Sequence, residues 1–205
     1  MSLFDFLFPP RVDELALRGI SDDDFLALVK PRIVPETRPS TVALLSFGDA
    51  SVRAAIHEAK YHGSERAFRL LGYALADYLR DADDISATRL NLVSLVPIPL
   101  GIERQKERGF NQVEEVAKRA VQELKIKIET CLLIRTRETI SQISLAREKR
   151  KENMRGAFKA TRHADPAYTY IVIDDVITTG ATLQSAVDAL KDAGAEHIIP
   201  LALAH

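Results

Sequence analysis

An apolar run followed by two adjacent acids is the feature that most constrains the fold of this chain. Residues 170–173 read Tyr-Ile-Val-Ile, which is typical of a parallel strand covered on both faces. Asp174 and Asp175 follow directly. Open α/β sheets bind ligands at the carboxyl ends of their strands. The segment therefore predicts a buried strand with a ligand site at its end.

The turn after the acids has the composition of an anion site. It comprises Thr178, Thr179, Gly180, Ala181 and Thr182, at the expected start of a helix. Hydroxyls and backbone N–H groups at a helix N-terminus bind phosphate, because the helix dipole is positive there. The alternative is an ordinary strand–loop–helix junction with a threonine N-cap and solvated acids. Adjacent acids repel each other, and this favours a functional site.

Composition restricts the class of protein. The 205 residues suit one domain with a small appendage, and the net charge of −1 provides no global field for nucleic acid or membranes. The single cysteine, Cys131, excludes an internal disulfide and a multi-cysteine zinc site, and its apolar neighbours predict that it is buried. No apolar run approaches the roughly 20 residues that span a bilayer. Residues 1–10 make a poor signal peptide, so we expect a cytoplasmic protein without membrane partners.

Hydrophobic periodicity predicts alternating strands and helices. The expected strands are an edge strand at 42–47, then 92–98, 128–134, 170–173 and 198–203, and the expected helices are 52–62, 67–78, 113–124 and 183–190. Ser21 and Asp24 could form a capping box, and three prolines follow at 31, 35 and 39. The pattern predicts an α/β fold with a mainly parallel sheet flanked by helices. We divide the chain into an N-terminal appendage or hood, 1–40, and a main domain, 41–205.

Residues 170–182 resemble the phosphoribosyl-pyrophosphate (PRPP) motif of type I phosphoribosyltransferases. The resemblance implies that fold, with Asp174 and Asp175 as the catalytic pair that contacts the ribose 2′ and 3′ hydroxyls, directly or through Mg²⁺. It also implies that the turn 178–182 wraps the 5′-phosphate. The Mg²⁺ cofactor would have no direct protein ligand and would be held through the substrate near the two acids.

Other segments are similar to the competence protein ComF family, a phosphoribosyltransferase-like group. They are 59–63 (Ala-Lys-Tyr-His-Gly), 96–100 (Val-Pro-Ile-Pro-Leu), 108–112 (Arg-Gly-Phe-Asn-Gln) and spaced residues between 135 and 158. The resemblance covers about residues 42–205. One departure is Val12, which stands where the family's zinc module has its first cysteine, so a zinc ribbon is excluded.

The resemblance assigns two further loops. Pyrophosphate binding would fall on 97–109, with Arg104, Arg108 and Gly109 as the leading residues. The flexible loop that closes over PRPP would contain Arg135, Arg137, Gln142, Arg150 and Asn153. A solvated basic loop and an exposed charged helix are the respective alternatives. His57, His62, His163 and His197 show no shared ligand spacing, and the sequence assigns them no role.

Two functions of different classes remain open. The first is a phosphoribosyltransferase, a pentosyl-transferring glycosyltransferase that moves phosphoribosyl from PRPP to an unidentified nitrogenous acceptor with release of pyrophosphate. The second is a catalytically silent PRPP-binding accessory protein that acts through partner contacts. The family implies a part in natural competence and DNA uptake, beside a helicase-like partner. A third reading is binding of single-stranded DNA by the basic segment 135–155, which predicts strong salt dependence.

Overall fold

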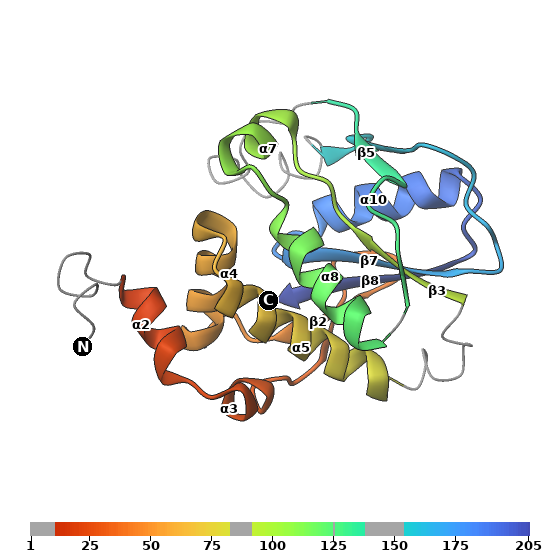
Figure 1. The fold of residues 1–205 in the computed structure, drawn as a ribbon. Helices are drawn as coiled ribbons and strands as arrows, with labels where there is room; N and C mark the ends of the chain where they lie inside the picture. The colour runs from red at the N-terminus through yellow and green to blue at the C-terminus, as the bar shows by residue number, and fades with distance from the viewer. Residues whose placement is uncertain (1–10, 83–91, 125, 138–153) are drawn as a thin grey trace.

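A six-stranded sheet forms the centre of the protein in the computed structural model, which describes residues 11–82, 92–124, 126–137 and 154–205 (Figure 1). The strand order is β1-β2-β8-β7-β3-β4, and only the β1–β2 pair is antiparallel. The strands are β1 (Arg32–Val34), β2 (Thr41–Leu45), β3 (Val93–Pro97), β4 (Lys127–Ile128), β7 (Thr169–Val176) and β8 (His197–Ala204).

Helices cover both faces of the sheet, and this confirms the predicted fold class. One face carries α4 (Ala50–His62), α5 (Glu65–Asp81) and α8 (Gln112–Leu124). The other carries α10 (Ala181–Asp192) and a two-stranded sheet of β5 (Leu133–Arg135) and β6 (Phe158–Ala160). Two short helices, α2 (Val12–Gly19) and α3 (Asp22–Leu26), lie against α4 and α5, and α7 (Ile102–Arg108) precedes α8. No helix in the described ranges is long and apolar enough to cross a bilayer.

The central strand β7 explains why the apolar run is continuous. Side chains of a strand point alternately to its two faces. Ile171 and Ile173 pack into the cluster under α4, α5 and α8, whereas Tyr170 and Val172 pack into the cluster under α10. All four are almost fully buried, because both faces of the sheet are covered.

Local signals fix the ends of α4, which carries part of the site. Asp49 caps its start by accepting hydrogen bonds from the N–H groups of Ser51 and Val52, at 2.8 and 3.2 Å. Gly63 ends it in the left-handed conformation, with φ of 57°. Ser64 then caps α5, so that the helix break predicted at Gly63 is confirmed.

The predicted helix start at Ser21 is confirmed, although the Asp24 carboxylate accepts from the Ser21 hydroxyl, at 2.6 Å, and not from the Ser21 N–H as a full capping box requires. Ser21 Oγ accepts a hydrogen bond from the Asp24 N–H at 3.0 Å and opens α3. Arg66 on α5 donates to the carbonyl of Ile20 and pairs with Asp22, and this holds α3 against α5. The boundary between 40 and 41 stays a prediction.

Four local predictions are wrong, each for a physical reason. Strand β2 is not at the edge of the sheet, because β1 forms between two prolines that suggested a linker. The expected loop 97–112 contains α7. The expected strand 128–134 is two strands in different sheets, β4 and β5, separated by a turn. Cys131 lies in that turn and is exposed, while Leu132 takes the buried position.

Candidate ligand site at the end of the central strand

The two acids lie at the carboxyl end of β7, between β3 and β8 in the sheet. Asp175 is buried, with 8% of its surface exposed, and Asp174 is half-buried. Their positions agree with the general location of ligand sites in parallel sheets. The two side chains nevertheless have different contacts, so we expect them to have different roles.

Asp175 is held by groups of the protein itself. Its Oδ2 accepts a hydrogen bond from Gln112 Nε2 at 2.8 Å and lies 3.3 Å from Lys60 Nζ. Its Oδ1 accepts a hydrogen bond from the Val176 N–H at 2.7 Å. Both oxygens are thus engaged by residues from α4, α8 and β7. We conclude that Asp175 organises the edge of the sheet.

Asp174 is the acid that lines a cavity. Its Oδ1 accepts a hydrogen bond from the Asp175 N–H at 2.9 Å. Burial and the neighbouring negative charge of Asp175 raise the pKa of Asp174 to about 7, against the opposing charges of Lys60 and Arg135. A carboxyl group with a strongly raised pKa in a hollow is a candidate for ligand chemistry.

The cavity beside Asp174 is formed mostly by the predicted phosphate turn. It has a volume of about 20 Å³ and is lined by Asp174 and residues 176–183. This volume holds about one water-sized group, as an oxygen of a phosphate would be. Gly180 is the N-cap of α10, and no side-chain hydrogen bond caps the helix there. The first N–H of the helix, that of Ala181, donates to Thr179 Oγ1 at 3.4 Å, and the positive amino end of α10 faces the turn.

Gly180 is fixed by both its conformation and its neighbours. Its φ is 69°, which disfavours residues with a Cβ. A Cβ there would lie 2.9 Å from the Cβ and carbonyl oxygen of Glu36 and from Cγ2 of Thr37. The segment before β2 thus packs directly on the turn. Between this segment, Arg155 and α10 lies a larger hollow of about 620 Å³.

The residues predicted to bind pyrophosphate occupy α7 and the turn after it. Arg108 Nη1 donates to Gln112 Oε1 at 3.0 Å, and its guanidinium lies 5.2 Å from the ring centre of Tyr61. Arg108 is therefore connected through Gln112 to Asp175. Gly109 ends α7 in the left-handed conformation, with φ of 77°. Arg104 is half-buried on α7, and no contact with the acids is seen among the described residues.

Two of the predicted flexible-loop residues lie in the described part of the chain. Arg135 is at the end of β5, with its guanidinium 5.8 Å from the ring centre of Phe158, and its positive charge acts on Asp174. Arg137 Nη2 donates to the carbonyl of Arg155 at 2.6 Å. Gln142, Arg150 and Asn153 lie outside the described residues.

Two residues of the site were not predicted. Lys60 and Gln112 contact Asp175, although they are far from it in the sequence. Both lie in segments, 59–63 and 108–112, whose resemblance to the ComF family was recognised without any role for these side chains. That resemblance was the only signal that could have found them.

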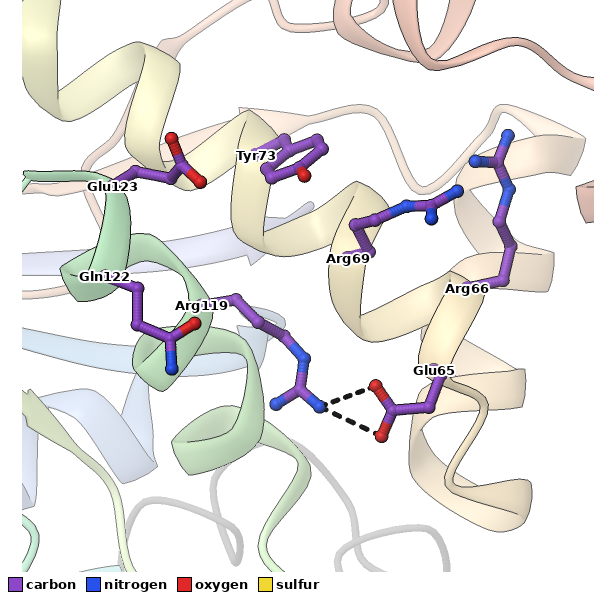
Figure 2. Close-up of a pocket in the computed structure, with 7 residues that line it drawn as sticks. All are labelled: Glu65, Arg66, Arg69, Tyr73, Arg119, Gln122 and Glu123. Carbon is purple, nitrogen blue, oxygen red and sulfur yellow. Dashed lines mark hydrogen bonds and ion pairs between the residues drawn. The ribbon is translucent and has the colours of Figure 1, made fainter.

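A hollow of about 320 Å³ between α5 and α8 also contains arginines, but its charges are compensated (Figure 2). Arg119 pairs with Glu65 at 2.7 Å and with Glu115 at 2.8 Å. Arg66 and Arg69 both pair with Asp22. These arginines serve to join helices, and we assign no anion site there.

Comparisons with known proteins agree with the motifs. Competence protein F of Haemophilus influenzae is 31% identical over 107 residues, 51% of this chain and 47% of its own. The DNA utilization protein YhgH of Escherichia coli is 30% identical over 49% of this chain and 44% of its own, and the competence protein ComFC of Bacillus subtilis is 30% identical over 49% and 39%. This chain thus matches somewhat less than half the length of each relative.

No protein-family model matches the chain. Among solved structures, adenine phosphoribosyltransferase of Leishmania tarentolae aligns over 90% of this chain and 89% of its own, at 12% identity and a TM-score of 0.39. About half of this chain is thus similar in sequence to competence protein F and competence protein ComFC, in agreement with its motifs.

Proposed function

We propose that this protein binds PRPP with Mg²⁺ at the end of β7 and transfers its phosphoribosyl group to a nitrogenous acceptor, with release of pyrophosphate. The observation that carries the proposal is the position of Asp174. Asp174 lines the same small cavity as residues 176–183, at the amino end of α10. A phosphate bound in the turn would therefore lie beside Asp174. The carboxyl group of Asp174 would then be available to hydroxyls of the pentose that carries the phosphate.

Each part of the ligand has a group that suits it. The 5′-phosphate would be held by the turn 178–182 through backbone N–H groups and hydroxyls. Ribose hydroxyls would donate to Asp174, while Asp175 keeps the edge in place. Mg²⁺ would be held through oxygens of the ligand near Asp174 and would neutralise charge on the pyrophosphate.

The leaving group requires positive charge on the α4 and α7 side. Lys60 and Arg108 lie around Asp175 and suit a departing pyrophosphate. Substitution at C1 of PRPP needs little covalent help from the protein. The protein must orient the acceptor, stabilise the leaving group and exclude water. Arg135 and Arg137 stay candidates for the loop that closes over the ligand.

The second candidate function is a PRPP-binding accessory protein in DNA uptake. It is favoured by the relatives, whose names state competence and DNA utilization and no transferase activity. In this case the ligand would act as a signal, and a helicase-like partner would receive it. Binding of single-stranded DNA by the segment 135–155 is a weaker proposal, and a flat dependence of affinity on salt would remove it.

Calorimetry with PRPP and Mg²⁺ tests the proposal. We expect binding by the wild-type protein, loss of binding in Asp174→Ala, and unchanged binding in Asp192→Asn, a control with an exposed acid at the far end of α10. Equal affinity of Asp174→Ala and wild type would contradict the site. Pyrophosphate release from PRPP with a panel of bases and amines then separates the transferase from the accessory protein.

A further inference from the structure

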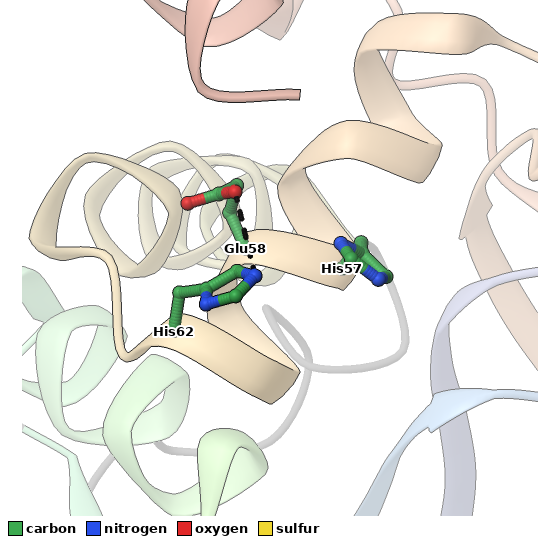
Figure 3. A group of neighbouring side chains, drawn as sticks. All are labelled: His57, Glu58 and His62. Carbon is green, nitrogen blue, oxygen red and sulfur yellow. Dashed lines mark ion pairs between the residues drawn. The ribbon is translucent and has the colours of Figure 1, made fainter. Parts of the chain in front are cut away.

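We propose that His57, Glu58 and His62 form a transition-metal site, suited to Zn²⁺, on the last two turns of α4 (Figure 3). One donor atom from each residue lies within 4.8 Å of the others. Two imidazoles and one carboxylate are a ligand set that zinc uses with a water as the fourth ligand. The site is separate from the two acids of β7 and does not depend on the function proposed for them.

The helix brings the donors together. Glu58 and His62 are four residues apart and share one face of α4, with His62 Nε2 4.0 Å from Glu58 Oε1. Bonds to zinc of about 2.0–2.1 Å would require donors about 3.3 Å apart in tetrahedral geometry. The side chains of His57 and His62 are 50% and 32% exposed, so both are open to a metal from solvent.

A second layer of contacts already orients two of the ligands. His57 Nδ1 lies 2.9 Å from Asp13 Oδ2 on α2, and a proton held there leaves Nε2 with its lone pair for a metal. Carboxylates support metal-bound histidines in this way in many zinc sites.

Glu58 is fixed from the same side. Its Oε1 and Oε2 accept hydrogen bonds from Arg11 Nε and Nη2 at 2.8 and 2.7 Å, and the carboxylate is fully buried. A carboxylate has about four acceptor positions, so Oε1 retains one for a metal on the His62 side.

A metal at this position would join the N-terminal helix α2 to α4. Both supporting residues, Arg11 and Asp13, come from the start of α2, whereas all three ligands come from α4. Metal binding would therefore stabilise the contact between the two helices, since a ligand of the folded state stabilises that state. Lys60 lies between Glu58 and His62 in the sequence and contacts Asp175. The last turns of α4 therefore contribute residues both to the proposed metal site and to the candidate site at the end of β7.

Titration of the untagged protein with Zn²⁺ and with Co²⁺ tests the proposal. We expect one equivalent to bind, a visible Co²⁺ spectrum typical of nitrogen and oxygen ligands, and a higher Tm with metal. His57→Ala and His62→Ala should each weaken binding by more than about tenfold, and Asp13→Asn by about tenfold or more. His197→Ala, at an exposed histidine on β8, is the control and should bind as wild type does.

Two results would overturn the proposal. One is the absence of stoichiometric metal binding by the wild-type protein. The other is binding that persists unchanged in both single-histidine variants, which would place the metal elsewhere. Circular dichroism of each variant shows that it is folded. PRPP binding is measured on the same samples, so that failure of the metal site and failure of the proposed function remain distinct.

Discussion

The two sides of the candidate site consist of different chemical groups. On the α10 side, the turn 178–182 offers mainly backbone groups and hydroxyls, and its shape depends on Gly180. On the opposite side, Asp175 is contacted by Lys60 of α4 and by Gln112 of α8, and Gln112 also accepts a hydrogen bond from Arg108 of α7. Ligand binding on the α10 side should therefore depend on the shape of the backbone. On the opposite side it should depend on single polar side chains.

The largest effect is expected from Gly180→Val, which attacks the backbone side. The substitution combines a φ of 69° with a Cβ that would meet Glu36 and Thr37 at 2.9 Å. We expect a loss of about 2–5 kcal/mol in the free energy of unfolding and complete loss of PRPP binding. Urea unfolding and calorimetry measure both. Gly19→Ala is the control, since no atom lies within 4 Å of its added Cβ, and a Gly180→Val protein of wild-type stability would refute the packing argument.

Asp175→Ala attacks the side-chain network and should have the next largest effect. Gln112 is buried and would lose its acceptor, and Lys60 would lose its ion pair. We expect the free energy of unfolding to fall by about 1–3 kcal/mol. Denaturant unfolding of Asp175→Ala beside Asp174→Ala sharpens the comparison, because the cavity-lining Asp174 should be much less costly to remove. Equal losses would mean that the two acids do not differ in role.

Asp174→Asn should change the pH dependence of stability. The pKa of Asp174 is about 7 in the folded protein and 3.8 for the ordinary group, so the folded state holds an extra proton between these values. The free energy of unfolding contributed by this group therefore falls as pH rises from 3.8 to about 7. Thermal unfolding from pH 4 to pH 8 should show a higher Tm for Asp174→Asn than for wild type at pH 8. The gain should disappear toward pH 4, and a gain that is the same at all pH values would contradict this assignment.

Lys60→Met should have the smallest effect on stability, about 1 kcal/mol, because Asp175 keeps its hydrogen bonds from Gln112 and Val176 when Lys60 is lost. Its effect on ligand binding should be clearer, since positive charge beside the acids is lost. Calorimetry should show weaker PRPP binding for Lys60→Met and none of that weakening for Lys30→Met, an exposed control. Equal PRPP affinities of Lys60→Met and Lys30→Met would show that Lys60 does not contribute to binding.

Local signals in the sequence predicted much of the framework. The apolar run 170–173 identified the central strand, and Gly63 and Ser21 marked helix ends, because these features act through neighbours only a few residues away. The short strand β1 was missed since Pro31 and Pro35 flank it, and Cys131 was assigned to the core because periodicity cannot locate a turn inside an apolar segment.

The residues of the sequence alone predicted the contiguous part of the candidate site, and the family resemblance added Arg108 and Arg135. Asp174, Asp175 and the turn 178–182 are adjacent in the chain, so their composition revealed them together. The contacts of Lys60 and Gln112 with Asp175 depend on the folding of α4 and α8 onto β7. Such pairings arise from tertiary packing, and a single sequence contains no direct record of them.

The close packing of Glu36 and Thr37 on Gly180 links the turn to the segment ahead of β2. The two segments are distant in the chain, yet a Cβ at position 180 would lie only 2.9 Å from atoms of Glu36 and Thr37, so the segment ahead of β2 lies directly against the turn. A ligand that favours one arrangement of the turn would therefore also favour one arrangement of the segment ahead of β2. By reciprocity, whatever docks on that segment alters affinity at the turn by the same factor. Occupancy of the turn by a ligand would in this way be coupled to the conformation of Glu36 and Thr37.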